Sequence, residues 1–197
     1  MVFCEWLACA GYIFFNLEVT MNILFTLVLA HLIADFPLQT DRIFAMKLKS
    51  SRGIALHVLI HLLVTALLIK DPLSHMPLFI ILAVTHFSID WLKLRFPTQR
   101  QVPGFLIDQV AHLTVLLFLA GTMTHLQSVL PAWLLIIAMI YAFVPPVIML
   151  LWLLAIDQGV VRTQTDRCIR WAQRHLLPLS QQAGLPLLVG VAFGLLL

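Results

Sequence analysis

Long apolar segments recur along this chain, and they restrict its possible folds more than any other feature. A membrane-spanning helix needs about 20 predominantly apolar residues, and five segments close to this length are separated by short polar stretches. Hydrophobic residues make up 61% of the sequence and charged residues only 11%, whereas soluble domains contain roughly 25% charged residues. We therefore expect an all-α protein, a polytopic transmembrane helical bundle with about five to six membrane helices.

Proline positions define several of the expected helix ends. The first helix should end just before Pro37, because proline disfavours helical geometry in the preceding residue. The fourth should start after Pro103-Gly104, and the fifth should kink at Pro145-Pro146. In chain order, we expect the helices over about residues 22–36, 53–69, 77–94, 105–121 and 130–156.

The N-terminal segment is unlike these helices. Val2–Phe15 is too short to span a membrane, and no Lys or Arg precedes it, so it makes a poor signal peptide. Met21 opens a long apolar run and is expected to be the true start of the protein. Residues 1–20 would then be an N-terminal extension.

The rest of the chain divides into two expected parts. Residues 21–121 should form a four-helix core, within which 38–52 is a short surface helix capped by Thr40. Residues 122–197 should contribute C-terminal helices and a basic loop. Their last apolar run, 185–197, is short for a full span and could be re-entrant or packed closely on a neighbour.

Basic residues predict the orientation of the bundle. If the helices alternate in direction, eleven of the 12 Lys and Arg residues fall on one side and only Lys70 on the other. Short loops rich in Lys and Arg stay in the cytoplasm. We therefore expect a bacterial cytoplasmic (inner) membrane protein with residues 38–52, 95–103 and 158–175 in the cytoplasm. Such scattered charge does not resemble a nucleic-acid-binding face, so no nucleic acid partner is expected.

Four pairs of His and Asp residues interrupt the apolar helices. Polar side chains within membrane helices are costly and mark functional sites by default. Each pair is spaced by four residues, so its members share a helix face and differ by about 6 Å in depth. Every pair also falls near the expected cytoplasmic end of its helix. The pairs are His31 and Asp35, His57 and His61, His86 and Asp90, and Asp108 and His112.

The pairs also define an internal repeat. Helices one and two carry one set and helices three and four a similar set, each around a basic loop. Both hairpins run in the same direction, so we expect a pseudo-repeat about an axis along the membrane normal. Helix bundles build metal sites from such inward-facing ligands on facing helices.

These donors suggest a divalent metal site. Imidazole and carboxylate ligands suit Zn, Mn or Fe. Three carboxylates against Lys93 would leave a net charge of about −2 in a medium of low dielectric constant, which a cation would compensate. A binuclear site, with one metal for each repeat, would fit the number of ligands. The alternatives are a hydrogen-bonded network that only holds the helices together, and a proton or ion pathway. The expected metal ligands are His31, Asp35, His61, His86, Asp90 and His112.

Some nearby residues are expected to support the metal ligands, and others are expected to have no role in the site. Gln39, Gln109 and Lys93 are expected around the ligands, with Lys93 either paired to Asp90 or extended to the membrane surface. Lys47 lies in the basic loop, where we expect it to be solvated. The three cysteines have neither metal nor disulfide spacing.

The motifs H-L-I-A-D-F-P-L-Q-T-D, H-V-L-I-H, H-F-S-I-D-W-L-K and F-L-I-D-Q-V-A-H carry a resemblance. Together they resemble a bacterial membrane family known as domain of unknown function 3307, over about residues 21–121. Gln39 and Gln109 lie where that family has glutamine, and the resemblance also favours Met21 as the start. It implies nothing about activity. The chain is also similar, in general character and not in aligned motifs, to membrane-bound metal-dependent hydrolases.

The expected function is a metal-dependent hydrolase of a lipid-linked or membrane-proximal (phospho)ester. The metal would activate a water, with Asp108 or His57 as the general base, because each is one turn from a ligand. Arg42, Lys47 or Arg52 could steer a phosphate. One alternative is a proton or divalent-metal transporter that uses the same residues, and another is a structural or assembly protein. Expected partners are membrane lipid and a small-molecule or lipid-linked substrate, and the oligomeric state stays open.

Overall fold

Helices account for nearly all of the computed structural model, which describes residues 2–158, with side chains from residue 19 onward. The short 3-10 helix η1 (Pro72–His75) lies between α3 and α4. The α-helices are α1 (Val2–Asp35), α2 (Asp41–Lys49), α3 (Ser51–Leu68), α4 (Met76–Arg95), α5 (Gln101–Thr122), α6 (Ala132–Ala142) and α7 (Val144–Asp157).

The long helices have the dimensions and composition of membrane spans. Four segments are long and apolar enough to cross a membrane: Ser51–Leu68, Pro72–Arg95, Gln101–Thr122 and Ala132–Asp157. The part of α1 from Val19 to Asp35 is a shorter apolar helix. Large hydrophobic side chains are exposed along the outward faces of the helices, as a lipid environment permits. The expected all-α helical bundle is confirmed.

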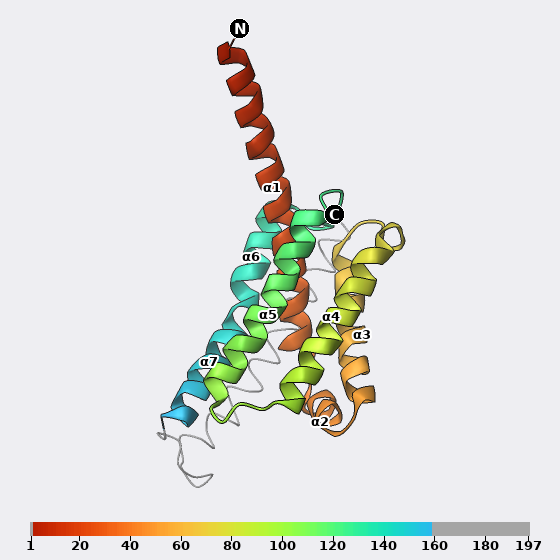
Figure 1. Cartoon of the computed structure of the whole chain (residues 1–197), viewed down its shortest axis with the longest axis vertical. Coiled ribbons are helices and arrows are strands. Elements are labelled where there is room, and N and C mark those ends of the chain that lie inside the picture. The colour runs from red at the N-terminus through yellow and green to blue at the C-terminus, as the bar shows by residue number, and fades with distance from the viewer. Residues whose placement is uncertain (1, 159–197) are drawn as a thin grey trace.

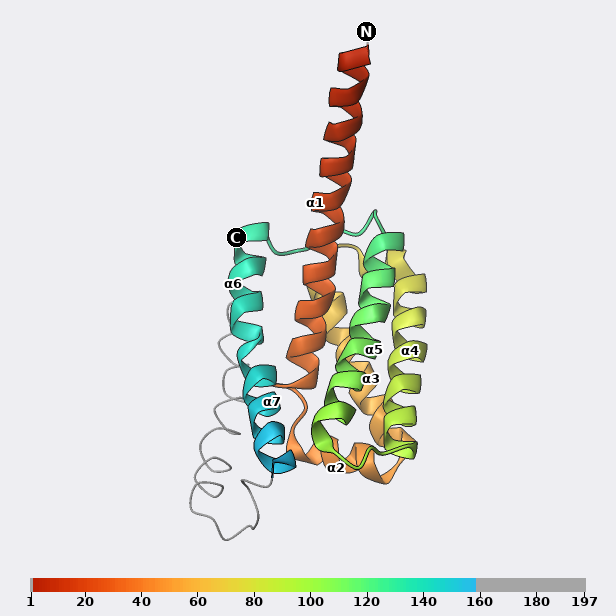
Figure 2. The same ribbon diagram turned by 60° about the vertical axis from the view of Figure 1, so that its left-hand side comes forward.

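Four helices form the core of the bundle. α1 packs against α3 and α5, and α4 packs against the same two helices, so that α1, α3, α4 and α5 close a ring. α6 packs on α1 and α7 packs on α5, outside this ring (Figures 1 and 2). The first part of α1 extends beyond the bundle (Figure 1). The predicted two-hairpin core thus has α6 and α7 on its outside.

One end of the bundle is basic. α2, the start of α3 and the connection between α4 and α5 lie at the lower end in Figure 1, and these segments contain Arg42, Lys49, Arg52, Arg95 and Arg100. We call this the basic end. Lys70 lies at the opposite end, after α3. The basic residues that follow α7 and the apolar run 185–197 lie outside the described residues.

Three helix boundaries differ from those expected. α1 begins at Val2, whereas the first helix was expected from about residue 22. α5 begins at Gln101, before Pro103, because the first turn of a helix needs no hydrogen bond from its N–H groups. The carboxylate of Asp157, at the end of α7, accepts hydrogen bonds from the backbone N–H groups of Gln101 and Val102, each at 2.9 Å. The predicted fifth helix is broken into α6 and α7 at Phe143, just before the two prolines.

The predicted surface helix is α2, and its N-cap is Thr40 as expected. Thr40 Oγ1 accepts a hydrogen bond from Ile43 N at 3.4 Å. α2 lies across the basic end and folds back on α3 (Figure 2). Ser50 ends α2 and also caps α3, accepting a hydrogen bond from Gly53 N at 3.3 Å. A Cβ on Gly53 would lie 2.1 Å from the carbonyl carbon and oxygen of Met46.

We expect Gly53→Ala to displace α2 from α3. The added methyl group meets backbone, which cannot move aside, so the change should cost about 1–3 kcal/mol of stability. Thermal unfolding of the detergent-purified protein measures this effect. The matched control is Gly121→Ala in α5, where a Cβ meets nothing within 4 Å. This control should be neutral or slightly stabilising, since alanine favours helix. Equal melting temperatures for the two variants would contradict the close approach.

Candidate metal centre in the helix bundle

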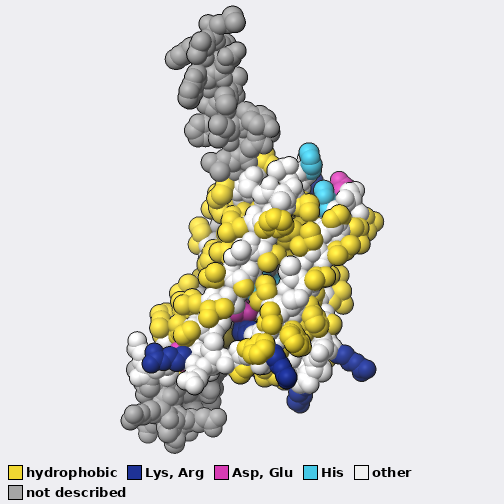
Figure 3. Space-filling view, viewed as in Figure 1, with side chains coloured by type: hydrophobic (Ala, Val, Ile, Leu, Met, Phe, Trp, Pro, Cys, Tyr) yellow, Lys and Arg dark blue, Asp and Glu magenta, His cyan; other side chains and the backbone are white. Residues whose placement is uncertain are grey.

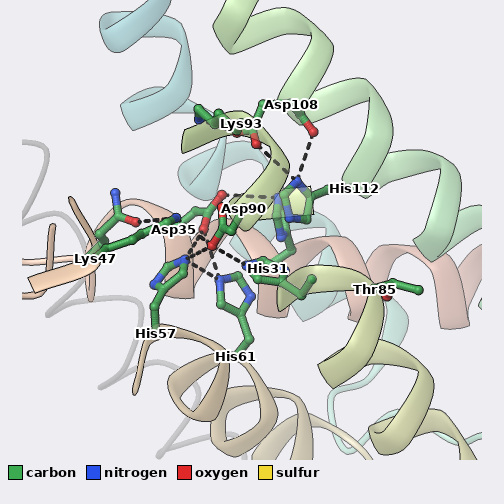
Figure 4. A network of polar contacts seen from close by, with 12 residues as sticks. His31, Asp35, Lys47, His57, His61, Thr85, Asp90, Lys93, Asp108 and His112 are labelled. Carbon is green, nitrogen blue, oxygen red and sulfur yellow. Dashed lines mark hydrogen bonds and ion pairs between the residues drawn. The ribbon is translucent and has the colours of Figure 1, made fainter. Parts of the chain in front are cut away.

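The four His and Asp pairs meet inside the ring of helices (Figure 4). α1 carries the first pair, α3 the second, α4 the third and α5 the fourth. The spacing of four residues keeps both members of each pair on the face that points inward. Seven of the eight side chains belong to buried residues, and the eighth, Asp35, is only 11% exposed.

Asp35 is at the centre of the closest contacts. Its Oδ1 lies 3.0 Å from His57 Nε2 and 2.9 Å from His61 Nε2, and these two nitrogens are 3.2 Å apart. A tetrahedral zinc ion with bonds of about 2.0 Å would separate its ligand atoms by roughly 3.3 Å. Two imidazole nitrogens at this separation need a proton or a cation between or beside them. Together with His86, these residues form one group that could hold a metal ion. We call it the Asp35 group.

His86, Asp90 and His112 form a second group that could hold a metal ion, which we call the Asp90 group. His112 Nδ1 lies 2.9 Å from the carbonyl oxygen of Asp108. A carbonyl can only accept, so the hydrogen is on Nδ1 and the other ring nitrogen is left to bind a ligand. The Nε2 atoms of His86 and His112 are buried without a hydrogen-bond partner.

His31 belongs to neither group. Its Nε2 lies 3.4 Å from Asp35 Oδ2, and its ring stacks on that of His112 with centroids 4.9 Å apart. We expected His31 as a ligand and His57 as a base, whereas the close groups contain His57 and leave His31 beside them. The reason is the packing of α3 on α1, which directs both histidines of α3 at one oxygen of Asp35.

The prediction that Lys47 is solvated is wrong. α2 folds back over the basic end, so the Lys47 side chain is only 8% exposed and its Nζ lies 2.7 Å from Asp90 Oδ2. Lys47 also donates to Gln39 Oε1 at 3.4 Å. A sequence signal existed, because Lys47 follows Ile43 by one turn on the face of α2 that packs inward.

Lys93 has a different partner from the one expected. Its Nζ lies 2.6 Å from Asp108 Oδ2, and it pairs with Asp108 instead of Asp90. Gln109 Nε2 donates to the same oxygen at 3.2 Å and to Asp35 Oδ2 at 3.4 Å. Asp108 is therefore held in an ion pair, and the base role that we expected for it would require that pair to open.

These ion pairs change the charge of the site. Three carboxylates and two lysine ammonium groups leave a net charge of −1 when the histidines are neutral, where we expected −2. The partners of the Asp35 carboxylate are imidazoles and the amide of Gln109. Within the described chain, no lysine or arginine pairs with it, in contrast to Asp90 and Asp108. The remaining negative charge therefore belongs to the Asp35 group.

A cavity of about 730 Å³ leads from the basic end to Asp35. Eight polar residues line the cavity, and apolar side chains line most of the rest. In Figure 3, acidic and basic side chains are visible between hydrophobic ones in the lower half of the molecule. The polar lining residues are Asp35, Gln39, Lys47, Lys93, Thr98, Gln101, Asp108 and Gln109. The expected supporting residues Gln39, Gln109 and Lys93 thus all line the cavity.

Residues 23–141 match the family described as "Protein of unknown function (DUF3307)". The chain belongs to this family. The predicted resemblance is confirmed, and it continues about 20 residues beyond its expected end, into α6. The match contains all four His and Asp pairs and the two lysines, Lys47 and Lys93, that pair with their carboxylates. A search of curated proteins found no match, and neither did a search of solved structures.

The donor set of this DUF3307 protein fits a divalent cation. The Asp35 group combines three imidazoles with one carboxylate, which are borderline ligands suited to Zn, Mn or Fe. Asp35 Oδ1, His57 Nε2 and His61 Nε2 are separated by 2.9–3.2 Å, close to the distance between two ligand atoms on one zinc ion. The fourth donor, His86 Nε2, has no hydrogen-bond partner. The Asp90 group is less suited, because Lys47 already neutralises its carboxylate.

Proposed function

We propose that this protein is a metal-dependent hydrolase that acts within the membrane on an ester of a lipid-linked or membrane-proximal substrate. One observation carries the proposal: the donor atoms of Asp35, His57 and His61 lie within 3.2 Å of one another, and Asp35 also lines the cavity. That cavity has mainly apolar walls, as an amphiphilic substrate requires.

The residues divide into three roles. Asp35, His57, His61 and His86 would hold the metal, which would supply Lewis acidity toward an ester oxygen or a water molecule. His31, beside Asp35 and with an unpartnered Nε2, would accept a proton. Gln109 would orient Asp35 through its hydrogen bond to Oδ2, and Lys93 would contact an anionic oxygen in the cavity.

The transporter alternative is less well supported. A transport pathway needs polar groups or water on both sides of the central site. On the side away from the basic end, the described part of the bundle is filled by the buried side chains of Leu27, Leu68, Leu78 and Leu119. The cavity reaches the site from the basic end. Access from the basic end, with apolar packing on the other side in residues 19–158, favours an enzyme.

Metal analysis of the detergent-purified protein tests the proposal. We expect close to one equivalent of Zn, Mn or Fe in the parent protein and its loss in His61→Ala, together with loss of ester hydrolysis. His75→Ala and His125→Ala, at the opposite end of the bundle, are the matched controls and should keep both. A parent protein without metal that remains fully stable would contradict the proposal and favour a purely structural network.

We also propose that the protein lies in the bacterial inner membrane with the basic end in the cytoplasm, on the basis of the positive-inside rule. In a variant without native cysteines, a membrane-impermeant thiol reagent should label Ser74→Cys and Thr124→Cys in intact cells and should not label Lys49→Cys. All three positions are exposed, whereas Leu126, in the same loop as Thr124, is buried and unsuitable for labelling. Labelling of Lys49→Cys from outside would reverse the orientation.

A further inference from the structure

We infer that the cavity takes a lipid with a phosphate headgroup, which enters sideways from the membrane leaflet at the basic end. This inference names the substrate class of the same site and so rests on the proposed function. It is drawn from the continuity of the cavity walls with the outer surface, from the position of Lys93, and from the charge of the site.

The walls of the cavity continue onto the outer surface of the bundle. Three lining residues from the facing ends of α4 and α5 are strongly exposed: Leu92 by 48%, Phe96 by 69% and Ile107 by 64%. On helices that span a membrane, such side chains face lipid. A water-soluble substrate would gain nothing from this surface, whereas an acyl chain can lie along it while its headgroup enters the cavity. The remaining apolar walls come from residues that include Phe36, Phe44, Phe105, Met149 and Leu153.

Lys93 is placed to meet an anionic headgroup. Its side chain is 39% exposed, and it lines the cavity with its Nζ 2.6 Å from one oxygen of Asp108. An ammonium group has three N–H donors, so the contact with Asp108 leaves donors for a phosphate oxygen. Lys47 lines the cavity at a more buried position, with its Nζ held by Asp90. A phosphate that passes Lys93 therefore approaches Asp35 and its histidines.

The charge of the site makes this binding depend on the metal. Without a metal, the three carboxylates and two lysines carry a net charge of −1, which repels an anion. A divalent cation in the Asp35 group changes this to +1 and attracts one. Because the coupling between two ligands is reciprocal, the phosphate lipid should also tighten metal binding. A neutral lipid of the same shape should show neither effect.

Native mass spectrometry of the full-length protein in detergent can test this inference. The probes are dioleoyl phosphatidic acid, dioleoylglycerol and inorganic phosphate, each with zinc-loaded protein and with protein treated with a chelator. We expect phosphatidic acid to bind zinc-loaded protein at least about tenfold more tightly than dioleoylglycerol, since a charge-assisted hydrogen bond contributes about 1.5–3 kcal/mol. The chelator and the substitution Lys93→Met should each remove most of this preference. Lys93→Arg should keep it, and so should Lys70→Met at the opposite end.

Equal binding of phosphatidic acid and dioleoylglycerol would overturn the inference. Binding of inorganic phosphate as tight as that of phosphatidic acid would also overturn it and would point to a soluble substrate. A preference that survives the chelator would refute the dependence on metal. The metal content of the same samples separates the two proposals. Protein that holds no metal contradicts the proposed function, whereas metal-loaded protein without a preference for phosphatidic acid contradicts this inference alone.

Discussion

Asp35→Asn is expected to remove most of the bound metal while the fold stays intact. The amide has the shape of the carboxylate but lacks its charge, and Asp35 Oδ1 is the atom that both histidines of α3 contact. Loss of a residue that only supports a ligand lowers metal affinity by about 10–100-fold, so loss of this ligand should exceed that range. The measurement is metal stoichiometry together with the melting temperature in detergent.

The matched control is Asp71→Asn at the opposite end of the bundle. Asp71 has a positive φ of 49°, a conformation that aspartate and asparagine both tolerate, so the control should keep its metal and its stability. If the site is an unmetallated network, Asp35→Asn removes a buried charge and should be neutral or stabilising. An increase in melting temperature, with no metal in either protein, would therefore disprove the metal site.

Lys47→Met should be the most destabilising single change at the site. It leaves the carboxylate of Asp90, which is 2% exposed, without its ammonium partner. The nearest imidazole nitrogens, from His86 and His57, are 3.6 and 3.8 Å away and offer poor compensation. Removing one partner of a buried ion pair costs about 3–5 kcal/mol. Thermal unfolding in detergent should show this loss, whereas Lys49→Met on the exposed face of α2 should change little.

The double variant Lys47→Met/Asp90→Asn isolates the pair. It removes both charges and should recover most of the lost stability, giving a large coupling energy in a double-mutant cycle. Asp90→Asn alone should be destabilising, because it leaves the ammonium group of Lys47 buried without its charged partner. Additive effects of the two substitutions would mean that the ion pair does not contribute to stability.

Local patterns were sufficient to predict the helices and the approximate site. The apolar runs located the helices that are long and apolar enough to cross a membrane, Pro145 and Pro146 located the break between α6 and α7, and Thr40 located the start of α2. These features depend on residues close together in the chain, which is why they could be predicted. The regular spacing of the four pairs likewise placed them on inward faces, and the structure brings them together.

Tertiary structure decided which atoms meet. Lys47 reaches Asp90 only because Gly53 lets α2 lie directly on α3, and Asp157 caps α5 from the end of another helix. Such contacts depend on how helices are rotated and placed relative to one another. Small differences in helix placement decide between a ligand and a neighbour: His57 Nε2 lies 3.0 Å from Asp35 Oδ1, whereas His31 Nε2 lies 3.4 Å from Asp35 Oδ2 and belongs to neither metal group. The sequence determined that polar groups would gather inside the bundle, and helix packing determined their partners and therefore the charge of the site.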